Sequence, residues 1–407
     1  MNTGKVREIL ESTDFIHLGG SPEEKKVAAY LQSLCEEMDI PAHTEPFPVA
    51  MTEMVSASLT VSGREIPCKG YKLCGTASVE APFLYMPNRD RASLAGVKGR
   101  IVLLDGGLPY WVYQDLVDNG AAGFITYDGD LLYADRDIDH KELRPYVSLG
   151  RRIPGVNINA KDALALVQEA PETVRISVEQ TESEGESLNV VADLPGETDE
   201  TIIMTAHFDT TSLSHGAYDN MTGCIGLLGV MEALKGTKHR RGIRFVFCGS
   251  EERGLLGSKA YVKAHEEELG KTPLVINLDM IGTWMGKFIC CVSAEEKLVH
   301  HIQYLCAEQG FGIEARQGVY SSDSTPFADG GVPALSFARI TTPNQSHIHS
   351  RYDTAALVSD EQMLKDIAFI ASFTGRMADA VVCPVAREIP DKVKTELDEY
   401  MNRKRKN

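Results

Sequence analysis

The second half of the chain alternates short apolar runs with longer stretches whose apolar positions recur at helical spacing. The short runs at residues 201–209, 243–252 and 273–282 are apolar and largely β-branched or aromatic, which is typical of buried strands. Longer apolar-faced stretches follow at 223–236 and 364–381. Strands that alternate with helices predict an α/β fold with a mostly parallel central sheet and helices on both faces.

The N-terminal segment carries the signals of a helix start. Ser21 can cap a helix, Pro22 suits its first position, and Glu23 and Glu24 favour its positive end. A stripe of apolar residues at helical spacing follows from 27 to 34. We therefore expect a helix that contributes one face to the same core.

Residues 52–183 have a different pattern. They predict a β-hairpin at 57–67, a buried strand at 98–107, a helix and strand within 110–130, and a strand and helix within 153–168. A chain of 407 residues exceeds the usual size of a single core, so two domains are expected. We expect a discontinuous domain of residues 1–51 and 184–390, a small β-rich insert at 52–183, and a charged C-terminal tail at 391–407. The last part of this tail, residues 396–407, is expected to be frayed.

Composition narrows the class of protein. With 43 % hydrophobic and 24 % charged residues the chain is globular, and its net charge of −17 argues against nucleic acid or an anionic membrane as partner. Nine cysteines occur without any CxxC pair, which makes a thiolate zinc site improbable and suits a reducing compartment. No signal-like apolar start and no run of 18 apolar residues is present. A cytoplasmic protein is expected.

Ionisable side chains gather where the predicted strands end. They are His207, Asp209, Asp219, Glu251, Glu252, Asp279, and the later His347 and His349. A lone histidine after a strand is usually structural, but several such positions supplying only His, Asp and Glu are harder to explain that way. Packing these charges together is costly unless a cation compensates. Imidazole and carboxylate without thiolate predict catalytic zinc, with cobalt or manganese as substitutes.

These motifs together resemble a known family, the co-catalytic two-zinc aminopeptidases, which are related to glutamate carboxypeptidase, transferrin receptor and glutaminyl cyclase. The resemblance covers residues 183–383 and the segment GGSPEEKKVAAYL, and it rests on HFD, YDN, SEE, NLDMIG, SSDSTPF and IHSRYDT. Residues 52–183 resemble the protease-associated domain through KGRIVLL, NGAAGFITYD and IPGVNI. That module carries no catalytic residues.

The resemblance implies roles for individual residues. Asp219 would bridge two metals, with His207 and Asp279 completing one site and Glu252 and His349 the other. Two zinc ions per chain are therefore expected.

The remaining implied roles concern catalysis. Asp209 would accept a hydrogen bond from the His207 imidazole, and Glu251 would be the general base, its loop turned by Gly249 and Gly254. Tyr320 is a candidate donor to the oxyanion. Asp323 falls at the family's Ser-Asp position, but it is followed by Ser324, where relatives often carry His, Tyr or Asn. Four other histidines, His215, His300, His301 and His347, are expected to lie outside the ligand set.

Several activities share this scaffold. An aminopeptidase or dipeptidase acting on peptides is the leading interpretation, with carboxypeptidase or glutaminyl cyclase chemistry, or a metal-free receptor, as alternatives. Asp219 follows His207 by only 12 residues and the insert precedes His207, which favours the aminopeptidases over the lid-bearing carboxypeptidases. The sequence leaves open the side-chain preference, the native metal, the role of the insert and whether the protein is a monomer or homodimer.

Overall fold

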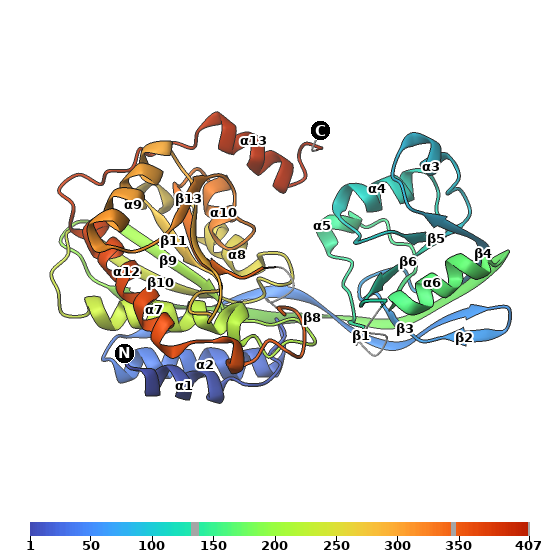
Figure 1. Cartoon of the computed structure of the whole chain (residues 1–407), viewed down its shortest axis with the longest axis horizontal. Coiled ribbons are helices and arrows are strands. Elements are labelled where there is room, and N and C mark those ends of the chain that lie inside the picture. The colour runs from blue at the N-terminus through green and yellow to red at the C-terminus, as the bar shows by residue number, and fades with distance from the viewer. Residues whose placement is uncertain (132–137, 343–346, 406–407) are drawn as a thin grey trace. The chain divides into compact units, whose positions relative to one another are not determined.

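The computed structural model describes residues 1–131, 138–342 and 347–405, and the chain divides into two compact units (Figure 1). Unit 1 comprises Met1–Val49 and Gly185–Asn407, and unit 2 comprises Ala50–Glu184. The chain enters unit 2 within the long strand β1 (Ala42–Val61) and leaves it within β8 (Thr173–Leu194).

The sheet of unit 1 is mostly parallel, as predicted. Its strands are β13 (Glu314–Gln317), β12 (Lys287–Ser293), β14 (Ala334–Ile340), β11 (Val275–Leu278), β9 (Thr201–His207), β10 (Gly242–Cys248) and the end of β8, in that spatial order. The four strands β14, β11, β9 and β10 run parallel, whereas β12 and β8 pair antiparallel to this central group. The carboxyl ends of the four parallel strands therefore meet at one edge of the sheet.

Alternating side chains of these strands pack on helices at both faces. Met204, Phe245 and Ile276 lie in one apolar cluster, whereas their neighbours Ile203 and Val246 lie in another. This alternation follows from the two-residue period of a strand and buries both faces of the sheet.

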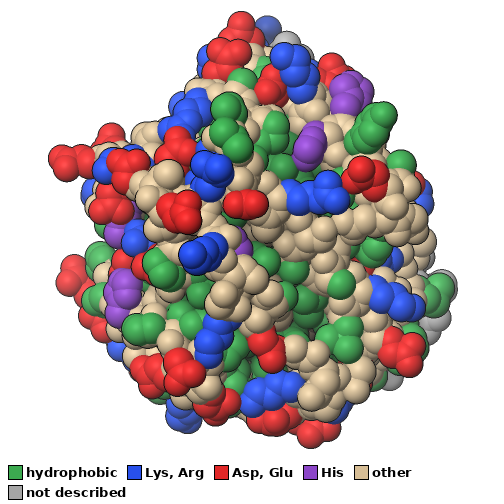
Figure 2. All heavy atoms as spheres, turned by 90° about the vertical axis from the view of Figure 1, so that its left-hand side faces the viewer, with side chains coloured by type: hydrophobic (Ala, Val, Ile, Leu, Met, Phe, Trp, Pro, Cys, Tyr) green, Lys and Arg blue, Asp and Glu red, His purple; other side chains and the backbone are tan. Residues whose placement is uncertain are grey.

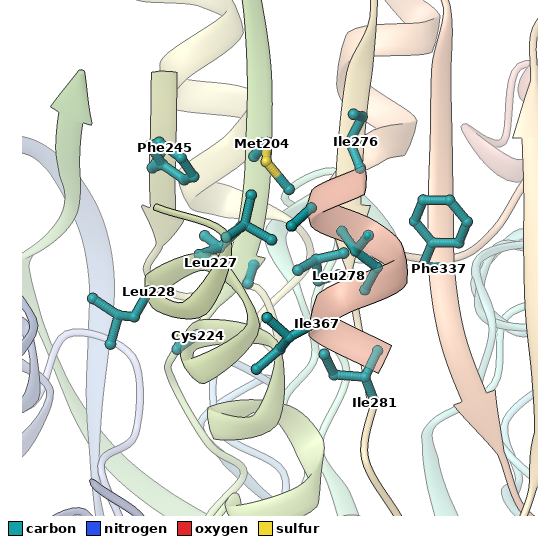
Figure 3. Packing of buried hydrophobic residues seen from close by; sticks show 14 of the residues in the cluster. Met204, Cys224, Leu227, Leu228, Phe245, Ile276, Leu278, Ile281, Phe337 and Ile367 are labelled. Atoms are coloured by element: carbon teal, nitrogen blue, oxygen red, sulfur yellow. The ribbon is translucent and has the colours of Figure 1, made fainter. Parts of the chain in front are cut away.

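The first face is covered by the N-terminal helices and by the long helices that follow in the chain. They are α1 (Thr3–Ser12), α2 (Pro22–Glu37), α7 (Thr222–Leu234), α9 (Glu296–Gln309) and α12 (Asp360–Asp379), and all five contribute to the larger cluster. Figure 3 shows Leu227 of α7 between Met204 of the sheet and Ile367 of α12. The helices approach closely at Gly229, where a Cβ atom would lie 2.8 Å from the Ile367 Cδ1 atom.

The second face is covered by α8 (Leu256–Ala264), α10 (Ser324–Asp329) and α13 (Asp391–Tyr400). The expectation of a frayed tail is wrong for α13, because Val393 and Leu397 are buried in the cluster that contains Phe327 and Tyr261. The two apolar residues stand one helical turn apart among charged ones, so the net polarity of the segment hid its buried stripe. Short 3₁₀ helices lie at Leu269–Lys271 and Ala355–Leu357.

Unit 2 has its own sheet and its own core. Strands β4 (Ala77–Met86), β5 (Ile101–Leu104), β6 (Gly123–Asp128) and β7 (Gly155–Asn159) run parallel, with β3 (Cys68–Gly70) antiparallel at one edge and the start of β8 antiparallel at the other. The predicted hairpin is confirmed by the pairing of β1 with β2 (Arg64–Ile66). Its helices are α3 (Arg91–Ala95), α4 (Tyr110–Asp118), α5 (Pro145–Ser148) and α6 (Ala160–Glu169).

Candidate metal centre

The ionisable residues singled out in the sequence come together at the carboxyl edge of the parallel strands. His207 is the last residue of β9, Asp279 directly follows β11, and Glu252 lies in the loop after β10. Asp219 lies in a short turn, Ala217–Met221, just before α7, and its own backbone angles (φ −113°, ψ 87°) are not helical. His349 lies in the loop after β14. Parallel strands deliver these side chains to one place although 142 positions separate the first from the last.

Five side chains form two groups of three that share Asp219. The ligand atoms of His207, Asp219 and Asp279 lie within 4.8 Å of one another, and so do those of Asp219, Glu252 and His349. One Asp219 oxygen, Oδ1, is 3.2 Å from Nε2 of His207, and the other, Oδ2, is 3.1 Å from Nε2 of His349. This division matches the ligand sets that the resemblance implied.

The electrostatics of the groups fit metal ions. Burial raises the pKa of Asp279 to about 7, with a further contribution from the Asp219 carboxylate. Burial also raises the pKa of Glu251 and of Glu252. Among the described residues, Oδ1 of Asp279 is a buried acceptor without a hydrogen-bond donor. Bound cations would coordinate this oxygen and offset the repulsion between the buried carboxylates. The carboxylate oxygens and imidazole nitrogens are ligands that suit zinc.

The two groups differ in their exposure to solvent. The side chains of His207 and Asp219 are buried, whereas 51 % of the His349 side chain is exposed. Burial opposes ionisation of His349, but the hydrogen bonds that its ring donates to the carboxylates of Asp219 and Glu252 raise its pKa overall. The site is therefore open to substrate on the side of His349.

Asp209 differs from the expectation in its hydrogen bonds. Nδ1 of His207 is 3.2 Å from the main-chain oxygen of Asp209 but 3.6 Å from the nearer carboxylate oxygen, which is too long for a hydrogen bond. The carboxylate instead accepts the backbone N–H groups of Glu251, at 2.7 Å, and Glu252, at 3.2 Å. Asp209 thus orients the imidazole through its main chain and the two glutamates through its side chain.

The loop that carries the two glutamates turns at Ser250. Its φ is +54°, in the left-handed region that non-glycine residues seldom adopt. Gly249 does not make this turn; it is required because there is no room for a side chain. A Cβ at Gly249 would lie 2.4 Å from the main-chain oxygen of Leu188. Gly254 has a φ of +113° and turns the chain as expected.

Two residues hold the Asp219 turn in place. Asp353 accepts the backbone N–H groups of Tyr218 at 2.7 Å and of Asp219 at 3.1 Å. Asn220 accepts from the N–H of Met280 at 3.0 Å and so ties the turn to the residue after Asp279. Sequence reasoning assigned no role to Asp353 or Asn220, although both lie within the quoted motifs.

The remaining candidates fall on both sides of the centre. Burial raises the pKa of Tyr320, with smaller contributions from the Asp279 and Asp219 carboxylates. Asp323 is fully buried, and its carboxylate accepts a 2.5 Å hydrogen bond from the Ser258 hydroxyl. Of these two residues only Tyr320 remains a candidate for substrate contact.

The four other histidines lie outside both ligand groups. His215 pairs with Asp14 at 2.7 Å, and the ring of His347 contacts that of Tyr352. His300 and His301 lie on α9. The selection of His349 over His347 agrees with this arrangement.

Comparison with known proteins points to a family. Over residues 189–374, the chain matches peptidase family M28. This stretch holds all five side chains of the two groups. This M28 domain occupies unit 1, and the residues of unit 2 lie outside the match.

Relatives of this M28 protein are named aminopeptidases. Aminopeptidase YwaD of Bacillus subtilis is 27 % identical over 335 residues, which are 79 % of this chain and 71 % of the relative. Leucine aminopeptidase 2 of Arthroderma otae is 31 % identical over 195 residues, 46 % of this chain and 38 % of that enzyme. The matches thus extend from the M28 domain to most of the chain.

Solved structures share the fold. An aminopeptidase from Aneurinibacillus sp. strain AM-1 superposes with a TM-score of 0.78 at 22 % identity, covering 95 % of this chain and 96 % of the other. The zinc aminopeptidase BSAP of Bacillus subtilis gives a TM-score of 0.77 at 22 % identity, covering 96 % and 97 %. The predicted α/β zinc-peptidase fold is confirmed.

Proposed function

We propose that this M28 peptidase is a zinc-dependent aminopeptidase that hydrolyses peptide bonds next to a free N-terminus. The observation that carries the proposal is the pair of ligand groups sharing Asp219, which suits two zinc ions held side by side. His207, Asp219 and Asp279 would hold one ion, and Asp219, Glu252 and His349 the other. Relatives named as aminopeptidases support this choice among peptidase activities.

Glu251 is the proposed general base. Its side chain belongs to neither ligand group, and its backbone is held by Asp209 beside Glu252. Zinc, when bound, supplies Lewis acidity that polarises the scissile carbonyl and lowers the pKa of water. Glu251 accepts the proton of the attacking water and passes it to the leaving amine. The Tyr320 hydroxyl would donate a hydrogen bond to the oxyanion.

The wider assignments follow from charge and cysteine chemistry. All nine cysteines are free thiols in the structure, which supports a cytoplasmic location. No helix among the described residues has the length and apolarity to cross a bilayer. On the face drawn in Figure 2, acidic and basic side chains are interspersed, with no continuous basic surface of the kind that binds nucleic acid. This supports peptides rather than nucleic acid as partners. The protein would act as a monomer or homodimer. Unit 2 would be a protease-associated-like module without catalytic residues.

Hydrolysis of aminoacyl-p-nitroanilides tests the proposal. Activity should disappear with a zinc chelator and return with zinc, and N-acetylated substrates should not be cleaved because an aminopeptidase requires the free amine. Glu251→Gln should retain zinc but lose about 100-fold or more in kcat. Dipeptides separate a dipeptidase from a broader aminopeptidase. Absence of chelator-sensitive hydrolysis of any free-amine substrate would favour the receptor-like alternative. Cleavage of N-blocked peptides would favour a carboxypeptidase.

A further inference from the structure

The N-terminal segment before α2 packs directly against the loop that carries Glu251. A Cβ at Gly19 would lie 2.3 Å from Oγ and 2.9 Å from Cα of Ser250, so only glycine allows this approach. The neighbouring Leu18 forms a parallel bridge with Thr210, and the main-chain oxygen of His17 accepts the Thr210 N–H at 3.2 Å. Residues 17–19, which are distant in sequence from the centre, thus contact Thr210 after β9 and Ser250 after β10.

Glu24, a few residues further along the chain, is a fully buried acid. It lies in the first turn of α2, where Glu23 instead exposes 42 % of its side chain. Oε1 of Glu24 accepts the Ser250 N–H at 3.1 Å and the Ser187 hydroxyl at 2.7 Å, and Oε2 accepts the Gly20 N–H at 2.6 Å. No arginine, lysine or histidine among the described residues forms an ion pair with it.

A buried acid without a counter-charge is costly for the fold. Burial, together with the nearby Asp209 carboxylate, raises the pKa of Glu24 to about 7. Stabilisation of the positive end of α2 does not require burial, since Glu23 occupies the same turn at the surface. The contacts of Glu24 with the loop offer a physical reason for an acid at this position.

These contacts fix the backbone that precedes the base. Three successive N–H groups of the loop are accepted by two buried acids: Ser250 by Glu24, and Glu251 and Glu252 by Asp209. The left-handed conformation of Ser250 is unfavourable for a non-glycine residue and persists only where surrounding contacts enforce it. The hydrogen bond to Glu24 is such a contact.

We propose that Glu24 is a positioning residue for catalysis, which holds Ser250 in its left-handed conformation and thereby aims the Glu251 carboxylate. This inference rests on the proposed function of Glu251 as general base. It makes the N-terminal helix part of the catalytic apparatus, because a displacement of about 1 Å in a reacting group can cost on the order of 100-fold in rate.

The variants Glu24→Gln and Glu24→Asp separate reach from charge. Glutamine keeps an acceptor oxygen for the Ser250 N–H and loses only the acceptor of the Gly20 N–H, so its kcat should stay within about threefold of the wild type. Aspartate keeps the charge but is one methylene shorter, so kcat should fall about tenfold or more, with KM and zinc content unchanged. Glu23→Gln and Glu23→Asp, in the same helical turn, are the matched controls and should leave kcat unchanged.

Coupling to Glu251 distinguishes positioning from a general loss of stability. In the Glu251→Gln background, Glu24→Asp should cause no further fall in the residual rate, because there is no base left to aim. Full kcat in Glu24→Asp, loss of zinc in parallel with kcat, or additive losses in the double variant would each overturn the inference. Failure of the proposed function would appear separately, as a wild-type enzyme without chelator-sensitive hydrolysis or an active Glu251→Gln.

Discussion

Asp219 is the residue on which the candidate centre depends, because its two oxygens face different histidines. Oδ1 lies 3.2 Å from His207 and Oδ2 lies 3.1 Å from His349, so a single carboxylate belongs to both ligand groups. Hydrogen bonds from Tyr218 and Asp219 N–H groups to Asp353 fix its turn. Loss of Asp219 should therefore affect both metal sites, and loss of a terminal ligand only one.

Metal content measures this difference. Asp219→Ala should abolish tight zinc binding at both sites, whereas His349→Ala should reduce zinc from about two ions per chain to about one. Elemental analysis after dialysis against a weak chelator reads out both values. His347→Ala is the matched control, since that histidine lies outside both groups. Unchanged zinc in His349→Ala would contradict the ligand assignment.

At the scale of elements, the sheet explains why separate segments converge. Parallel strands β9, β10 and β11 end at the same edge, where His207 is the last residue of β9 and the loops after β10 and β11 carry Glu252 and Asp279. Left-handed backbone occurs at Ser250, Met280 and His349, so the loops after β10, β11 and β14 each turn sharply at or near a ligand. The strands determine where the ligand residues lie, and the turns determine where their side chains point.

Helix α13 shows that elements remote from the loops also matter for the fold. Leu397 is 2 % exposed and Val393 is fully buried against the second face of the sheet. Leu397→Ala should cost about 2–5 kcal/mol of local stability. Amide hydrogen exchange of the 391–400 peptide should then accelerate at least tenfold, while kcat stays close to wild type. Lys392→Ala, at an exposed position of the same helix, serves as the control. Rapid exchange of this peptide in the wild type would restore the expectation of a frayed tail.

At the scale of the whole molecule, the buried acids link stability to pH. The pKa of Asp279 is raised from 3.8 to about 7, and those of Asp353 and Glu24 also reach about 7. A carboxyl whose folded pKa is raised contributes stability that is fully present below its unfolded pKa and is lost as pH rises through the folded value. The lowered pKa values of His17 and of Asp219 act in the opposite direction, that of Asp219 at pH values near and below the ordinary aspartate pKa. The acids therefore predict that stability falls as pH rises.

The metal-free chain should show this fall directly. Its Tm should decrease between pH 5 and pH 8, and the decrease should be smaller in Asp279→Asn, which removes one titrating group. Saturating zinc should reverse the trend, because its ligands bind in their deprotonated forms and ligand binding stabilises the folded state. Differential scanning calorimetry of the stripped and reloaded protein measures both. A Tm of the stripped protein that rises with pH would contradict the pKa assignments.

The sequence by itself determined the class of fold and the identity of the ligand candidates. Periodicity distinguished strands from helices in both units, because a buried strand or an amphipathic helix imposes its spacing on apolar residues. Residue types at strand ends indicated a metal centre, because imidazoles and carboxylates gather there only with a compensating cation. His349 was selected over His347 through its motif alone.

Only the tertiary structure decided how these residues are held. The acceptance of the Glu251 and Glu252 N–H groups by Asp209, and of the Ser250 N–H by Glu24, depends on three-dimensional proximity that no local pattern encodes. The left-handed turn at Ser250 rather than Gly249 follows from the same contacts. The packing of α13 is likewise a property of the surface that receives it, since two apolar residues in a charged segment carry too weak a periodicity to predict burial. Spacing along the chain specifies elements, whereas contacts between distant segments specify the positions of their side chains.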